Sequence, residues 1–305
     1  MEHLVLALVL LANTLAMGSL LHRQHRDVTQ LLVLDMAPNS FDDQYQGCTH
    51  MMKEELEDLN HTEFTNNNIY SKAWTLATEE WQSRRSRVSL PRALRPEHAI
   101  TLLAYTQQSD LYSNFNKAVR VAGSSKEEYL HSFSFKVLHF LLTEALSILW
   151  DTQPQLPRCH QVYRGVKGIQ FTTRRQQHIR FGSFTSTSFR EKRAADFGRN
   201  TFFSVMTCYG VPVGDFSFYP DEEEVLIPPF EIFEVTNVTS HHGNRTVIHL
   251  HSEDTSSTHN CVYVKEKRCK TRRCVFSAGR SILGDPSHLW VLLLPAMVLA
   301  STQGP

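Results

Sequence analysis

The first half of the chain carries apolar residues at the three- and four-residue spacing of amphipathic helices. This spacing occurs in SKAWTLATEEW (71–81) and in FKVLHFLLTEALSILW (135–150). Because residues three and four apart lie on one face of a helix, both segments are predicted to be helices with that face in the core. Between them, RPEHAITLLAYT (95–106) fits either a helix that ends near Tyr105 or a strand, and its pattern leaves both open.

Beyond Pro154 and Pro157 the pattern changes to short runs of β-branched and aromatic residues, separated by Gly, Pro and Asn. Such runs are typical of a mostly antiparallel sheet. The predicted strands lie in HQVYRGV, GIQFTT, IRFGSFTSTSF, NTFFSVMTCYG, EEVLI, FEIFEVT, RTVIHLH and CVYVK. The chain is therefore predicted to have an α+β fold, with a helical N-terminal part followed by a mixed, mostly antiparallel two-sheet β core.

The two ends of the chain differ from its middle. Residues 4–16 are apolar but too few to span a bilayer, and small residues follow up to Gly18, so residues 1–18 are predicted to be a cleaved secretory signal. Since no Lys or Arg precedes this run, an uncleaved N-terminal anchor is the alternative. Residues 289–300 are again apolar, and small residues at 277–279 with a polar spacer match a signal for a glycosylphosphatidylinositol (GPI) anchor over 278–305. If that tail is not processed, the protein is secreted.

One folded domain then remains, over residues 19–277. It ends in KEKRCKTRR (265–273), which holds six basic residues in nine and is predicted to be a solvated stem, with a docking patch for anionic headgroups or glycans as the alternative. The chain carries 31 basic and 31 acidic residues, so its net charge of zero gives no electrostatic case for a nucleic-acid partner. A membrane is expected to be contacted only through the lipid anchor, which gives an extracellular location at the cell surface.

The six cysteines stand in a chain with a predicted secretory signal. They are therefore expected to form disulfides rather than metal sites or free thiols, and spacing alone selects none of the fifteen complete pairings. Sequons at Asn60, Asn237 and Asn244 agree with passage through the secretory pathway. The chain has no HExxH and no GxGxxG motif, so the sequence predicts neither a metal site nor a Rossmann-type nucleotide site.

Three carboxylates, those of Glu222, Glu223 and Glu224, stand directly before the apolar run 225–227. If a strand begins within the glutamates, alternation places Glu222 and Glu224 on one face and Glu223 on the other. Two carboxylates on one partly shielded surface disfavour double ionisation, which makes the pair a candidate for general-base and charge-stabilising work. Taken alone, the stretch also fits a solvated charge cluster before a strand.

Two further runs carry polar groups suited to a ligand. Arg164 follows an apolar strand, and its fork of donors suits a diphosphate, while Gly165 would let a ligand approach the backbone. Ser186 and Ser188 share one strand face, where small hydroxyls leave room for a ligand ring and supply hydrogen bonds. Arg164 could instead pair with a surface acid, and Ser186 could merely suit a pleated strand.

An arginine, then an S-T-S strand, then E-x-E before V-L-I-P-P, in this order, resembles the arginine-specific mono-ADP-ribosyltransferases of vertebrate cell surfaces. The likeness covers nearly the whole mature chain. Its segments, in family order, are FDDQYQGC (41–48), LLAYT (102–106), FKVLHFLL (135–142), VYRG (162–165), RFGSFTSTS (180–188), EEEVLIPPFE (222–231) and HNCVYVK (259–265).

The resemblance implies an enzyme that transfers ADP-ribose from its co-substrate NAD to arginine side chains of target proteins and releases nicotinamide. Arg164 would bind the dinucleotide, Ser186 would orient the nicotinamide side and the catalytic acid, and Glu224 would be the catalytic glutamate. Glu222 would make the acceptor an arginine. Residues 218–221 would face the target protein, with Tyr219 as the exposed aromatic residue.

The same resemblance suggests Tyr105, Gly165 and Ser217 as further nucleotide contacts beside Arg164 and Ser186, and no metal. It also implies two disulfides, Cys48–Cys261 and Cys159–Cys208, and leaves Cys269 and Cys274 as an extra pair or free. Two alternative functions stay open: an NAD glycohydrolase, in which water replaces arginine, and a catalytically silent cell-surface binding protein that kept the fold.

Overall fold

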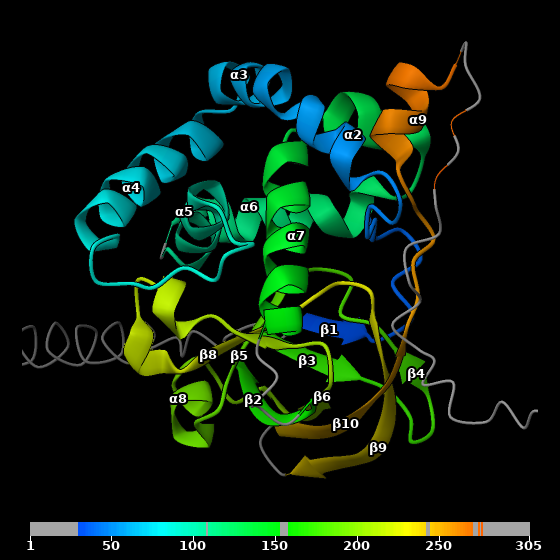
Figure 1. Ribbon diagram of the computed structural model, residues 1–305. Coiled ribbons are helices and arrows are strands. Elements are labelled where there is room, and N and C mark those ends of the chain that lie inside the picture. The colour runs from blue at the N-terminus through cyan, green and yellow to red at the C-terminus, as the bar shows by residue number, and fades with distance from the viewer. Residues whose placement is uncertain are drawn as a thin grey trace, which may run out of the picture.

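A computed structural model describes residues 30–107, 109–152, 158–241, 245–270, 274 and 276. The predicted secretory signal (1–18) and anchor signal (278–305) lie outside these residues. Most helices lie in the first half of the chain and most strands in the second, as predicted, and the helices and strands form layers one above the other (Figure 1). Within the described residues, no helix is both long and apolar enough to cross a membrane.

The helical layer contains the two segments whose periodicity predicted helices, which lie in α4 (Asn68–Arg84) and α7 (Lys136–Thr152), together with helices that the periodicity did not single out. Its other members are α2 (Thr49–Glu54), α3 (Leu56–Asn66), α5 (Pro96–Thr106), α6 (Asp110–Ala122) and a short π-helix (Glu128–Ser132). The segment left open, 95–106, is a helix: Pro96 occupies its first turn, where the missing N–H costs nothing. Its buried residues include Leu102 and Tyr105, three positions apart, so Tyr105 faces the core from the last turn.

The β layer is a mixed, mostly antiparallel sheet. It contains β2 (His160–Val166), β4 (His178–Ile179), β5 (Thr185–Ser188), β6 (Thr201–Thr207), β7 (Val211–Pro212), β8 (Glu224–Ile227), β9 (Glu231–His241) and β10 (Arg245–Thr255), in the order β4-β9-β10-β6-β2-β5-β8-β7. Among these strands only β6 and β10 pair in parallel. A second, two-stranded sheet joins β1 (Gln30–Val33) to β3 (Ile169–Thr172). The predicted α+β class with two sheets is confirmed.

Strand β8 shows how the two faces of the large sheet are used. Val225 and Ile227 belong to an apolar cluster formed by the sheets, whereas Leu226 belongs to the cluster shared with the helices. Since side chains alternate along a strand, Glu224 lies on the same face as Leu226, toward the helical layer. The boundary between the two layers is thus where an acidic residue of β8 can meet residues of the helices.

One predicted strand is wrong. CVYVK (261–265) was expected to be extended, but it opens helix α9 (Val262–Arg268), which packs near α2 (Figure 1). The run is too short for alternation to separate a strand from a helix with one buried residue, here Val264. The helix is fixed by its contacts, because Lys267 and Arg268 form ion pairs with Glu55.

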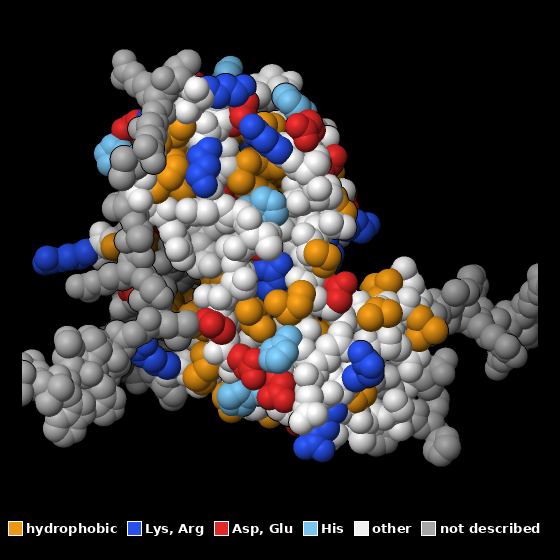
Figure 2. Space-filling view, turned by 90° about the vertical axis from the view of Figure 1, so that its right-hand side faces the viewer, with side chains coloured by type: hydrophobic (Ala, Val, Ile, Leu, Met, Phe, Trp, Pro, Cys, Tyr) orange, Lys and Arg blue, Asp and Glu red, His pale blue; other side chains and the backbone are white. Residues whose placement is uncertain are grey.

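These ion pairs also change the picture of the basic stretch 265–273. Its described part forms ion pairs with Glu54 and Glu55 at the C-terminal end of α2 and with Glu266 of α9 itself, so it is not a freely solvated stem. Figure 2 shows basic and acidic side chains intermixed over the upper part of the face that carries α2 and α9. Much of the basic charge in the described part of this stretch is therefore paired.

Three disulfides tie the fold together. Cys48–Cys261 joins the start of α2 to the start of α9, and Cys159–Cys208 joins the strands β2 and β6 at their ends. Both pairings were implied by the family resemblance and are confirmed. Cys269 and Cys274, whose state was left open, also form a disulfide.

Candidate active site

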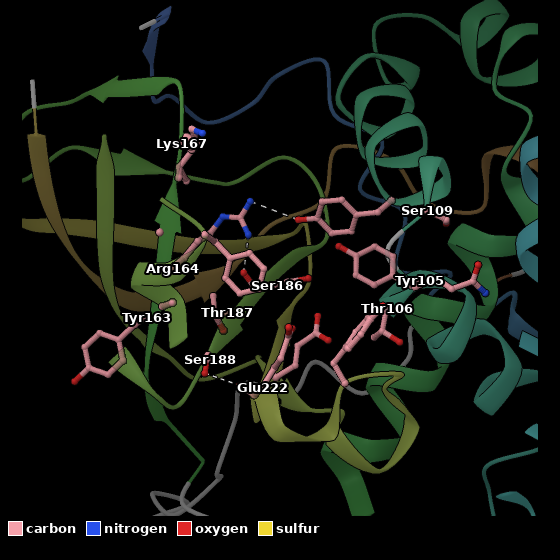
Figure 3. A pocket seen from close by; sticks show the side chains of 18 of the residues that line it. Tyr105, Thr106, Ser109, Tyr163, Arg164, Lys167, Ser186, Thr187, Ser188 and Glu222 are labelled. Atoms are coloured by element: carbon pink, nitrogen blue, oxygen red, sulfur yellow. Dashed lines mark hydrogen bonds between the residues drawn. The ribbon is translucent and has the colours of Figure 1, made fainter. Parts of the chain in front are cut away.

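A cavity of about 920 Å³ lies between the helical and β layers. Residues of α5 and α6 and of the turn between them line one side, and residues of β2, β5 and β8 line the other. In Figure 3 the side chains of Tyr105 and Thr106 from the helical layer face the guanidinium of Arg164 and strand β5, with its serine and threonine hydroxyls, across this space. The cavity brings together residues from the three segments that the sequence offered as ligand or catalytic sites, namely those around Arg164, around Ser186 and at the glutamates 222–224.

Arg164 is held in place from both layers. Its Nη1 donates to the carbonyl oxygen of Ser186 on β5 at 2.7 Å, and its Nη2 donates to the hydroxyl of Tyr112 on α6 at 3.4 Å (Figure 3). Burial works against the charge of Arg164, but Tyr112, Tyr105 and Glu224 outweigh it and raise the pKa of the guanidinium. A permanently charged donor fork therefore faces the cavity, as anion binding requires.

The two serines of β5 have different tasks. Ser186 lines the cavity and lowers the pKa of Glu224, while the hydroxyl of Ser188 donates to the carbonyl oxygen of Glu222 at 2.6 Å. Ser188 is also the residue of β5 directly paired with Glu224. Ser186 thus favours the ionised form of Glu224, and Ser188 fixes the backbone that carries Glu222.

Glu222 and Glu224 both line the cavity, but the predicted reason was wrong. Strand β8 begins only at Glu224, whereas Glu222 ends a 3-10 turn (Pro220–Glu222), so strand alternation does not relate them. Between them Glu223 has left-handed backbone angles, φ 47° and ψ 50°, which are rare for a residue with a side chain. This residue turns the chain so that both flanking carboxylates reach one cavity while its own lies half exposed beside Arg190.

The two carboxylates lie in different electrostatic environments. Glu224 is only 7% exposed, and its pKa is raised from the ordinary 4.5 to about 7, chiefly by burial and in part by the charge of Glu222. Hydrogen bonds with Ser186 and Ser217 and the charge of Arg164 act in the opposite direction. Glu222 instead accepts an ion pair from Arg193 of helix α8 (Glu191–Asp196), with 2.7 Å between Nη2 and Oε1.

Gly165 lines the cavity but is required for another reason than ligand approach. A β-carbon at this position would lie 2.2 Å from the carbonyl oxygen of Ala194 and 2.3 Å from that of Gly198. Glycine therefore lets α8 and the turn after it pack directly on β2. Through α8, this packing sets the position of Arg193 over Glu222.

Of the two remaining predicted nucleotide contacts, Tyr105 belongs to the described wall of the cavity and Ser217 does not. Tyr105 is fully buried and forms part of the cavity wall, with its hydroxyl donating to the carbonyl oxygen of Phe184 at 2.8 Å. Ser217 is not part of the wall formed by the described residues. It lies behind Glu224, and its hydroxyl also accepts the backbone N–H of Tyr219, a wall residue, at 3.0 Å. Ser217 is thus placed to hold Glu224 and the loop 218–221.

Sequence reasoning missed Tyr112 and Arg193. Tyr112 lies on a strongly amphipathic helix, where an aromatic residue is expected in the core, and Arg193 lies in a charged segment that reads as solvated surface. Neither residue carried a motif that could have found it, because each acts through a contact with a distant part of the chain.

The donor set fits a dinucleotide with a cationic ring. A fixed guanidinium can bind a pyrophosphate, the buried Tyr105 and the half-buried Tyr112 offer apolar walls, and two carboxylates can face a developing cation. The volume also lies in the range of sites that bury most of a ligand of this size. In the part of the chain that the structure describes, no group of His, Cys, Asp and Glu could hold a metal ion.

Comparison with known proteins gives the family. The protein-family model that is described as NAD:arginine ADP-ribosyltransferase matches residues 34–258 of this chain. The chain is 52% identical over 279 residues to the erythroblast NAD(P)(+)--arginine ADP-ribosyltransferase of Gallus gallus, covering 92% of this chain and 91% of that protein. It is 46% identical over 292 residues to the GPI-linked NAD(P)(+)--arginine ADP-ribosyltransferase 1 of Homo sapiens, covering 91% and 89%.

Solved structures agree. The crystal structure of the eucaryotic mono-ADP-ribosyltransferase ART2.2 is similar at a TM-score of 0.65 and 36% identity, covering 76% of this chain and 99% of that chain. A mutant of ART2.2 in complex with NADH is similar at a TM-score of 0.66 and the same identity. The predicted resemblance is confirmed: the chain belongs to the NAD:arginine ADP-ribosyltransferase family.

Proposed function

We propose that this protein transfers ADP-ribose from NAD to arginine side chains of proteins and releases nicotinamide. The observation that carries the proposal is one cavity in which Arg164 lies opposite two carboxylates, Glu222 and Glu224, of different burial. The names of the related arginine ADP-ribosyltransferases support the same chemistry.

Each residue then has a role that its surroundings allow. Arg164 binds the pyrophosphate, and Tyr105 and Tyr112 wall the dinucleotide site. When the bond between nicotinamide and C1′ of the ribose breaks, nicotinamide leaves with the bonding electron pair and the ribose becomes an oxocarbenium-like cation. Ionised Glu224, held by Ser186, stabilises that cation, as carboxylates do in glycosidases.

Glu222 acts on the other reactant. A guanidinium is protonated at neutral pH and is a poor nucleophile. Glu222 orients the acceptor and accepts one proton as a guanidino nitrogen forms the new bond to C1′. This need for a second carboxylate separates transfer to arginine from hydrolysis, in which water attacks the same carbon.

The experiment is an incubation of the purified domain with NAD and agmatine, a small guanidino acceptor, with both products measured. The agmatine adduct is expected, together with some free ADP-ribose. Free ADP-ribose without adduct would instead establish an NAD glycohydrolase, and no shift in melting temperature with NAD would favour a silent binding protein. Glu224→Gln should abolish both reactions, whereas Glu222→Gln should impair transfer more than hydrolysis.

We place the enzyme outside the cell, on the surface through a GPI anchor. The disulfides and the GPI-linked relative support this location. Treatment of expressing cells with a phosphatidylinositol-specific phospholipase should release the protein into the medium. Spontaneous secretion, with none left on the cells for the phospholipase to release, would identify the tail as an inefficient anchor signal.

A further inference from the structure

The carboxylate assigned to the acceptor already holds a guanidinium. Nη2 of Arg193 lies 2.7 Å from Oε1 of Glu222. Among the described residues, no other basic side chain lies within ion-pair distance of Glu222. An acceptor arginine would present a guanidinium to Glu222, and Arg193 of the chain itself already places a guanidinium there.

Arg193 also contacts two further groups in the same conformation. Its Nη1 lies 3.7 Å from Oδ2 of Asp196, and its guanidinium carbon lies 5.8 Å from the ring centre of Phe197. Phe197 is 51% exposed and lines the cavity, so this aromatic face stands at the cavity mouth. A guanidinium that leaves Glu222 can keep a carboxylate and a ring face as partners, which reduces the cost of leaving.

We propose that Arg193 is an internal competitor for the acceptor subsite, so that a target arginine must displace it from Glu222. The inference rests on the proposed function, because it takes Glu222 as the acceptor carboxylate. Arg193 would then set the affinity for the acceptor and the discrimination between target proteins. A target that makes further contacts with the enzyme can displace Arg193, whereas an isolated guanidine binds more weakly because it must displace Arg193 alone.

The expected effect is modest because the pair is partly solvated. The Arg193 side chain is 41% exposed and that of Glu222 is 14% exposed, which puts the pair near the upper end of the range for exposed ion pairs. If Arg193 occupies Glu222 about four-fifths of the time, the affinity for a competing guanidine falls about fivefold. Removing Arg193 should therefore lower the KM for agmatine about fivefold.

Arg190 offers a matched control. It begins the same short segment, is 59% exposed, and pairs with Glu223 at 3.7 Å rather than with Glu222. Arg193→Gln and Arg190→Gln remove the same charge from the same surface, so a general electrostatic effect on a cationic acceptor should be equal in both. The inference predicts that only Arg193→Gln lowers the KM for agmatine, with the KM for NAD unchanged in both.

The decisive measurement combines kinetics with binding. Initial rates of agmatine modification are measured at saturating NAD for the wild type, Arg193→Gln, Arg193→Lys and Arg190→Gln, with melting curves to verify folding. Arg193→Lys, which keeps the charge but loses the planar fork, should give an intermediate KM. Calorimetric titration with agmatine is then made on the wild type and Arg193→Gln, and on each in a Glu222→Gln background, where Arg193 should no longer matter.

An unchanged or increased KM in Arg193→Gln would overturn the inference, since Arg193 would then be neutral or would orient Glu222 for the acceptor. Equal effects of Arg190→Gln would overturn it as well. If the wild type forms no agmatine adduct, the proposed function fails. The calorimetric comparison still decides the inference in that case, because it measures displacement of Arg193 without requiring the reaction.

Discussion

Glu224 should titrate near neutral pH, and this can be measured as an acid limb in the activity of the enzyme. The perturbation is pH itself. Glu224 has a pKa of about 7, raised chiefly by burial, and only its ionised form can stabilise the ribose cation. The rate should therefore fall as pH decreases through about 7.

The magnitude separates this expectation from an ordinary glutamate. With a pKa of about 7, roughly nine-tenths of the carboxyl groups are ionised at pH 8 and roughly one-tenth at pH 6, so kcat/KM should fall about tenfold between them. A glutamate at the ordinary value of 4.5 would stay almost fully ionised over the same interval, and kcat/KM would change by only a few per cent.

The assay is the initial rate of nicotinamide release at subsaturating NAD from pH 5.5 to 9, because kcat/KM reports the ionisation of the free enzyme. Glu222→Gln provides the internal test, measured on NAD hydrolysis. Since the charge of Glu222 raises the pKa of Glu224, this variant should move the acid limb to lower pH. A flat profile between pH 6 and pH 8 would refute the reasoning, and an unmoved limb in the variant would refute the coupling between the two acids.

Three further outcomes follow from the structure. Glu224→Gln should be more stable than the wild type at pH 8 by up to about 3 kcal/mol and equal to it near pH 4.5, because a raised carboxyl pKa makes stability fall as pH rises from 4.5 to about 7; urea unfolding at both pH values checks this. Gly165→Ala, whose β-carbon would meet the Ala194 carbonyl, should lower unfolding free energy by about 1–3 kcal/mol, with equal urea midpoints as the contrary result. Replacing Cys48 and Cys261 by serine should lower the free energy of unfolding by about 2–5 kcal/mol, and a melting temperature equal to that of the wild type would contradict this expectation.

The sequence predicted the parts of the fold that repeat a simple period over many residues. The stripe in α7 (138, 141, 142, 145 and 149) lies wholly in the core, although α7 is buried on every side over 136–143, and β10 buries alternate residues along most of its length. The segment 261–265 lacked this advantage. It is short, and its helix depends on Cys261, held by Cys48, and on ion pairs with Glu55, which directly follows α2 and which only the folded chain brings close.

The sequence predicted which residues form the candidate site, but not how the backbone brings them together. Arg164, Ser186, Glu222 and Glu224 do line one cavity, yet the left-handed conformation of Glu223 has no local signal, since glutamate is not a residue that favours it. The contact between Arg193 and Glu222 joins residues 29 positions apart in the sequence, so it follows from packing rather than from a motif.

The difference between the two acids follows from that turn. Had a regular strand carried Glu222 and Glu224 on one face, both would sit in similar surroundings, and two like charges in one environment would compete for a single proton. The turn instead leaves Glu224 at the start of a fully buried strand and lifts Glu222 onto the edge, within reach of Arg193 and of solvent. The buried acid is suited to the ribose, which the dinucleotide site must enclose, and the edge acid to an arginine that arrives from outside on another protein.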